Sequence, residues 1–74
     1  MNLSNQDIGK LLKITGIKDE EVMLRLNELG VFEGNTIKKL NQAPFSGPIL
    51  IQHEGLKLAL RFAEAAQIST EINE

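Results

Sequence analysis

The sequence predicts one small, mainly β domain, in which about five short strands form a strongly bent barrel and a short helix follows the first strand. Its 74 residues leave room for one apolar core, so residues 1–74 are expected to form a single domain. Apolar and polar residues alternate from Leu56 to Phe62, as in a half-buried strand. Helical spacing begins after Asp19 and stops at Gly30. A bent barrel suits so few strands because each strand edge finds a partner.

The composition is that of an ordinary globular chain, with 42% hydrophobic and 24% charged residues. The formal net charge of −2 provides no broad attraction for nucleic acid. The chain has no cysteine, which excludes disulfides and thiolate metal sites and fits a reducing compartment. No apolar run approaches the length of a membrane span, and the segment 1–7 lacks the features of a signal peptide. We therefore expect a cytoplasmic protein that is not embedded in a membrane.

The chain is expected to begin with a loosely attached lead-in followed by the first strand. The segment 1–7 is polar apart from Leu3 and is rich in residues that favour turns and caps. The first strand is predicted over Ile8 to Ile17, where apolar residues alternate imperfectly with lysines between two glycines.

The helix is predicted to start at Asp19, whose carboxylate can accept hydrogen bonds from the free amides of a first helical turn. Leu24 is expected to face outward. Gly30 suits the left-handed conformation that ends a helix, and Val31 is expected to fold back on the helix end. The apolar face that should pack on the sheet consists of Val22, Met23, Leu26 and Leu29.

The second half of the chain predicts four further strands. A turn at Gly34 and Asn35 leads into a strand over Thr36 to Gln42, whose broken alternation indicates a bulge. Two prolines and a glycine make Ala43 to Pro48 a loop. Beyond it we expect a strand over Ile49 to His53, a turn at Glu54-Gly55 and a strand from Leu56 with its leucine face in the core. A helical turn at Ala63 to Gln67 and a closing strand at Ile68 to Ile72 are expected to follow.

No enzyme is expected, because the acidic residues form no recognisable pair. Asp19, Glu20 and Glu21 lie where a helix start favours negative charge. The three serines are scattered, and the chain contains no nucleophile elbow, glycine-rich phosphate loop or HExxH pair. These acids are therefore interpreted as structural.

His53 and Glu54 are the only residues that suggest a metal, since an imidazole beside a carboxylate can bind a divalent transition metal. Adjacent strand residues point to opposite faces, however. The favoured interpretation of His53 is a hydrogen-bonded residue at the edge of the core, and no metal or other cofactor is expected.

Three apolar side chains lie outside the regular core pattern: Leu24, Phe32 and Phe45. Exposed together, they would form a patch for a protein partner. The alternative is that the two phenylalanine rings plug the ends of the barrel and that Leu24 is an ordinary exposed leucine.

A nucleic-acid site is disfavoured. Lys38 and Lys39 adjoin on one strand and project oppositely, and Lys57 with Arg61 makes only a weak positive stripe. The chain has no tyrosine or tryptophan on which bases could stack. The same shortage of aromatic rings argues against a groove for proline-rich peptides.

Three motifs in a fixed order support a more specific interpretation. They are RLxxLGxxxG (Arg25, Leu26, Leu29, Gly30, Gly34), AP followed by GP (Ala43-Pro44, Gly47-Pro48) and LALR (Leu58 to Arg61). With them, the stretch from Arg25 to Ile72 resembles the FeoA family, which comprises the small ferrous iron transport protein A and a related barrel at the end of iron-dependent repressors.

The resemblance implies an SH3-like barrel with a helix inserted after the first strand, as a stand-alone domain. It also implies a non-enzymatic cytoplasmic accessory of bacterial ferrous iron uptake, which docks on a membrane ferrous iron permease with a GTPase domain. The alternative function is a regulatory module that binds a transition metal, with His53 and Glu54 as its candidate ligands for Fe²⁺ or another divalent ion.

Overall fold

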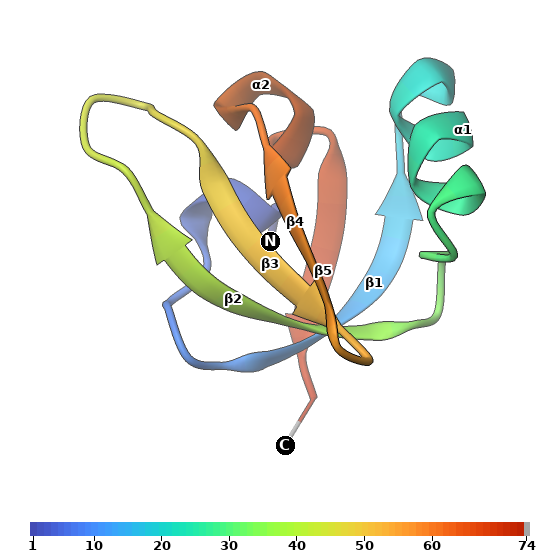
Figure 1. Ribbon diagram of the computed structural model, residues 1–74, viewed down its shortest axis with the longest axis horizontal. Coiled ribbons are helices and arrows are strands. Elements are labelled where there is room, and N and C mark those ends of the chain that lie inside the picture. Colours follow the sequence, from blue (N-terminus) through green and yellow to red (C-terminus); the bar gives the residue numbers. More distant parts are fainter. Residues whose placement is uncertain (74) are drawn as a thin grey trace.

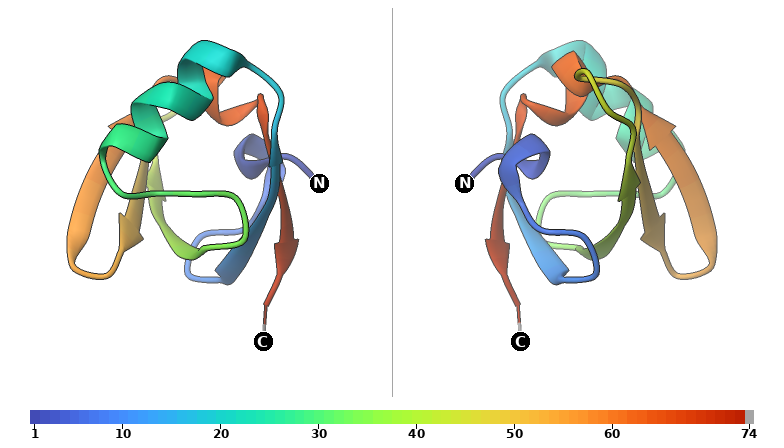
Figure 2. Two further views of the ribbon diagram at one scale, coloured as in Figure 1. Left: turned by 90° about the vertical axis from the view of Figure 1, so that its right-hand side faces the viewer. Right: turned by 90° about the vertical axis from the view of Figure 1, so that its left-hand side faces the viewer.

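The computed structural model describes residues 1–73 and confirms the mainly β barrel with one inserted helix. Five antiparallel strands form one curled sheet in the order β4-β3-β2-β1-β5 (Figure 1). The strands are β1 (Leu11–Ile17), β2 (Thr36–Gln42), β3 (Ile49–His53), β4 (Leu56–Leu60) and β5 (Ile68–Ile72). A 3-10 turn, η1 (Leu3–Asn5), precedes them, α1 (Glu20–Glu28) follows β1, and α2 (Phe62–Ala65) connects β4 to β5. Both α-helices lie at one end of the barrel, with the β3–β4 turn at the other (Figure 2).

Helix α1 begins and ends where its local sequence predicts. The Asp19 carboxylate accepts hydrogen bonds from the amides of Glu21 and Val22, at 2.9 and 3.1 Å. Gly30 has a φ of 87°, and the Val31 amide folds back to donate to the Leu26 carbonyl at 2.9 Å. The buried face of the helix is narrower than predicted. Val22 and Leu26 are buried and Met23 is partly buried, but Leu29 is exposed because it caps the helix beyond its last turn.

The strand connections also follow the sequence. The pairing of β2 with β3 shifts register between Lys39 and Asn41, which confirms the predicted bulge. Glu54 and Gly55 both have positive φ, 46° and 85°, and form the two-residue turn between β3 and β4.

The core fills the inside of the sheet with side chains from all five strands and α1. The expectation that the leucine face of β4 is core is only partly correct. Leu60 is buried and Leu58 and Phe62 pack against the core, but Leu56 is exposed. The physical reason is that β4 is an edge strand, and no other strand of residues 1–73 pairs with its outer side. The buried apolar residues are Leu3, Leu12, Ile14, Val22, Leu26, Val31, Ile37, Ile49, Ile51, Leu60, Ala65 and Ile68.

The expectation of a loosely attached N-terminal segment is wrong. Leu3 is completely buried, and the main chain of Met1 exchanges hydrogen bonds with Thr70 of β5, with an amide-to-carbonyl distance of 2.7 Å. The Gln6 side chain also donates to the Thr70 hydroxyl at 3.0 Å. The segment therefore covers the outer edge of β5, a role that its polar composition did not reveal.

The first strand is shorter than predicted, because β1 begins at Leu11 and not at Ile8. Gly9 has a φ of 89°, and its amide donates to the Lys39 carbonyl at 2.8 Å, which makes a turn ahead of the strand. Ile8 is consequently exposed.

Candidate functional site

Leu24 lies on the outer side of α1, as helical geometry predicts. The helix buries Val22 and Leu26 against the barrel, and Leu24 falls between them in sequence on the opposite side. About half of its surface, 51%, is exposed. Leu24 is therefore accessible to a partner at the helical end of the barrel.

Phe32 lies in the turn that follows α1. The amide of Phe32 donates to the Asn35 side-chain oxygen at 2.8 Å, and the amide of Asn35 donates back to the Phe32 carbonyl at 3.0 Å. This turn leaves Phe32 half exposed next to the fully buried Val31. Phe32 is thus a second accessible apolar side chain close in sequence to α1.

Phe45 lies at the tip of the β2–β3 loop and is 99% exposed, so its ring does not plug the barrel. Both Phe45 and Ser46 have a φ of 58°, and the Gly47 amide donates to the Pro44 carbonyl at 3.2 Å across them. Two consecutive left-handed residues form hairpin turns readily when they are Asn or Gly, and a phenylalanine there is sterically disfavoured. The fold therefore holds a large apolar side chain in solvent on a strained backbone.

The three predicted contact residues do not form one patch. The loop that carries Phe45 and the helix that carries Leu24 lie at opposite sides of the molecule (Figure 1). A partner that contacts both regions must therefore span the barrel.

His53 and Glu54 come closer together than their positions in sequence suggested. The Nε2 atom of His53 lies 3.7 Å from a carboxylate oxygen of Glu54, because Glu54 belongs to the turn and not to the strand. The other ring nitrogen, Nδ1, lies 3.0 Å from the Thr36 carbonyl, so it carries the proton and donates it. Nε2 is therefore the ring nitrogen that faces Glu54. Within residues 1–73, no group of three or more His, Cys, Asp or Glu side chains surrounds a shared point.

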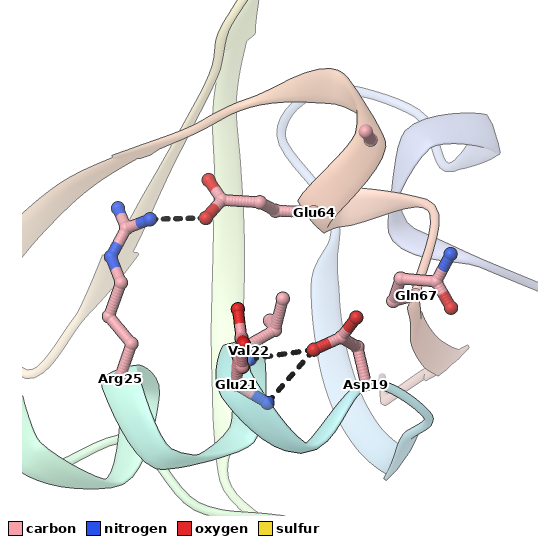
Figure 3. A pocket seen from close by; sticks show the side chains of 7 residues that line it. Asp19, Glu21, Val22, Arg25, Glu64 and Gln67 are labelled. Atoms are coloured by element: carbon pink, nitrogen blue, oxygen red, sulfur yellow. Dashed lines mark hydrogen bonds and ion pairs between the residues drawn. The ribbon is translucent and has the colours of Figure 1, made fainter.

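A cleft of about 410 Å³ separates α1 from α2 (Figure 3). Its residues are Asp19, Glu21, Val22, Arg25, Ala63, Glu64 and Gln67. The Arg25 guanidinium crosses the cleft and forms an ion pair with Glu64. Glu64 also accepts from the Arg61 amide at 2.8 Å and so caps α2, while Asp19 caps α1. The ion pair between Arg25 and Glu64 thus connects α1 to α2. The sequence did not predict this contact, because the two residues are distant in the chain.

Lys39 is a buried charged residue that the sequence did not reveal. Its side chain is completely buried, and Nζ donates to the carbonyls of Leu3, Ser4 and Gln6 at 3.2, 3.3 and 2.7 Å. Burial lowers the pKa of Lys39 below its usual 10.5, and the charge of Asp7 partly opposes this shift. Sequence placed Lys39 on the face opposite Lys38 but did not show that this face is buried.

None of the helices in residues 1–73 has the length and apolar character that a bilayer span requires. The curled antiparallel sheet with a helix after its first strand defines the class of the protein, a small SH3-like barrel domain. More narrowly, the chain belongs to the FeoA domain family, whose model matches residues 1–72.

Solved structures agree with this assignment. The FeoA protein from Chlorobium tepidum is 33% identical, with a TM-score of 0.87 over 97% of this chain and 70% of that chain. A FeoA-like protein from Clostridium acetobutylicum is 30% identical, with a TM-score of 0.83 over 97% of this chain and 85% of that one. The zinc complex of Stenotrophomonas maltophilia FeoA, a procaryotic SH3 domain protein, is 25% identical, with a TM-score of 0.80 over 96% and 89% of the two chains. No curated protein sequence matches the chain.

Proposed function

We propose that this protein is a non-enzymatic accessory of bacterial ferrous iron uptake, which docks in the cytoplasm on a membrane ferrous iron permease with a GTPase domain. Membership of the FeoA domain family supports a role in ferrous iron transport. The Stenotrophomonas maltophilia relative is described as "possibly acting as a bacterial ferrous iron transport activating factor". A relative from Clostridium thermocellum, 27% identical, is described as an iron(II) transport protein A.

The observation that carries the docking proposal is the exposure of Phe45. A ring that is 99% exposed contributes nothing to the core, and its left-handed backbone lowers the stability of the loop. A rigid aromatic ring at a loop tip is well suited to enter a pocket on a partner, where aromatic residues supply much of the binding energy. Leu24, on the opposite side of the barrel, provides a second contact.

The test is a titration of fluorescently labelled protein with the cytoplasmic domain of the permease and with the whole permease in detergent. We expect saturable binding, which Phe45→Ser weakens at least about tenfold, the usual effect of losing a buried aromatic anchor. Leu24→Ser should weaken it less and leave the melting curve almost unchanged.

Ile72→Ser is the matched control, because Ile72 is half exposed on β5, outside the predicted contact residues. A wild-type signal that does not change with either form of the permease would contradict the docking proposal. If Phe45→Ser and Ile72→Ser bind the permease with equal affinity, the docking proposal stands but Phe45 is not part of the contact.

The second candidate function is a metal-binding regulatory module. It is favoured by the tautomer of His53, whose Nδ1 donates to a backbone carbonyl and whose Nε2 faces Glu54. A carbonyl on the second ring nitrogen is the usual support of a histidine that ligates a metal. Two ligands make a weak site, so a partner or a second copy would have to complete it.

Anaerobic calorimetric titration with Fe²⁺ or Mn²⁺ tests this second function. Heat that appears with the wild-type protein and disappears with His53→Ala would support it. Binding heat that survives the substitution would rule out this site.

A further inference from the structure

The two edge strands of the sheet, β4 and β5, differ in whether another segment pairs with their outer side. At the β5 edge, Met1 and Asn2 pair with Thr70 and Ser69, so the N-terminal segment covers it. No strand of residues 1–73 pairs with the outer edge of β4, which forms a margin of the ribbon in both views of Figure 2. β4 therefore presents main-chain groups to solvent.

The hairpin register identifies those groups. His53 and Leu56 flank the two-residue turn and form its hydrogen-bonded closing pair, and hydrogen-bonded and non-bonded pairs then alternate along β4. Leu56, Leu58 and Leu60 accordingly bond to β3, while the amides and carbonyls of Lys57 and Ala59 point away from the sheet. The Arg25 guanidinium confirms this alternation, since it reaches the Ala59 carbonyl from outside, at 3.4 Å.

The side chains beside this edge alternate in chemistry. On the inner face, Leu56 is exposed and Leu58 is only partly buried, so apolar surface is available for a neighbour. On the outer face, Lys57 lies next to Gln52, which in turn lies next to Lys38, and this row across three strands is basic. Arg61 follows at the end of the strand and is also exposed.

The geometry points to β4 as a strand-addition site for an extended acidic peptide, whose apolar residues alternate with Asp or Glu. Such a peptide would bond to the amides of Lys57 and Ala59 and to the Lys57 carbonyl, with its carboxylates beside Lys57 and Arg61 and its apolar side chains beside Leu56 and Leu58. A second copy of the chain fits less well, because it would bring its own Lys57 and Arg61 to the same edge and place like charges together.

The probe is a capped heptapeptide in which Glu and Val alternate, titrated into ¹⁵N-labelled full chain. We expect the amides of Lys57 and Ala59 to shift most and to become protected from hydrogen exchange. The same peptide with lysine in place of glutamate should bind at least about tenfold more weakly, as should a version methylated on its edge-facing amides.

Two variants test the edge within the protein. Lys57→Pro removes an outward amide, a change that edge strands tolerate, and should weaken binding at least about tenfold. Lys57→Glu keeps the amide and should make the protein bind the lysine peptide more tightly than the glutamate peptide. This variant tests the strand-addition site even if Lys57→Pro unfolds. Phe45→Ser should leave peptide affinity unchanged, which separates this site from permease docking.

Either of two results would overturn the proposal. One is the absence of shifts at Lys57 and Ala59 with the acidic peptide at millimolar concentration. The other is a concentration-dependent dimer in which both amides are already protected without peptide, which would assign the edge to a second copy of the chain.

Discussion

The ammonium of Lys39 lies 2.7 Å from the backbone carbonyl of Gln6, in the interior of the protein. It also donates to the carbonyls of Leu3 and Ser4, so one side chain from β2 binds the whole turn formed by η1. A buried charge is tolerated only when it is fully hydrogen-bonded, and here three carbonyl oxygens match the three ammonium protons. This contact attaches the N-terminal segment to the barrel.

Lys39→Met is expected to lower the free energy of unfolding by about 2 to 4 kcal/mol, because it leaves three buried carbonyls without their donor. Denaturant unfolding measures the loss, and the amides of η1 should exchange faster than in the wild type. Lys38→Met, a neighbour whose side chain is exposed, should change stability little. Equal stability of the two variants would show that the segment is held by its apolar contacts instead.

The lowered pKa of Lys39 predicts how stability depends on pH. In the unfolded chain this lysine titrates near its usual value of 10.5, and in the folded protein its pKa is lower. Between the two pKa values the unfolded state binds more protons, so the free energy of unfolding rises with pH relative to Lys39→Met. Below the folded pKa, both states are protonated and the difference between the two proteins is constant.

The Lys39 pKa can be measured directly by following the ¹³Cε resonances of the lysines with pH. The midpoint for Lys39 should lie below 10.5, the usual pKa of a lysine side chain. A midpoint at 10.5 would contradict the prediction and would mean that the carbonyls offset the whole cost of burial.

Glu64 joins α1 to α2, and Glu64→Ala should reduce stability by about 1 kcal/mol. The loss comes chiefly from the missing cap on the Arg61 amide, since Arg25 is 44% exposed and its ion pair is screened by solvent. Thermal unfolding at low and high salt separates the two contributions, because only that of the ion pair depends on salt. Glu33→Ala, in an exposed loop, is the control. A loss that vanishes completely in high salt would assign the effect to Arg25.

Phe45→Asn is expected to raise the free energy of unfolding by up to about 1 kcal/mol, because asparagine adopts the left-handed conformation more readily than phenylalanine. The melting temperature should therefore rise even though a large apolar side chain is removed. The same variant should bind the permease more weakly. Phe45 would then be a residue that lowers the stability of the fold but contributes to binding of the partner. A fall in melting temperature would show that the ring packs on its own loop.

The sequence by itself determined the order of the helices and strands, the cap at Asp19, the helix end at Gly30 and the turn at Glu54-Gly55. These features depend on hydrogen bonds and backbone preferences among residues a few positions apart, which a single chain displays directly. The fold class also followed, because alternation and helical spacing reveal which sides of each element are apolar.

Only the tertiary structure decided which of those sides are covered. Lys39 is buried because the N-terminal segment packs against it and accepts its hydrogen bonds. The accepting carbonyls belong to residues more than thirty positions away in the sequence. Leu56 is exposed because β4 lies at the edge of the sheet, and Phe45 is separated from Leu24 because the curled sheet carries its loop to the far side from α1. Such outcomes depend on how distant segments pack together, and the local pattern of a chain carries no record of that packing.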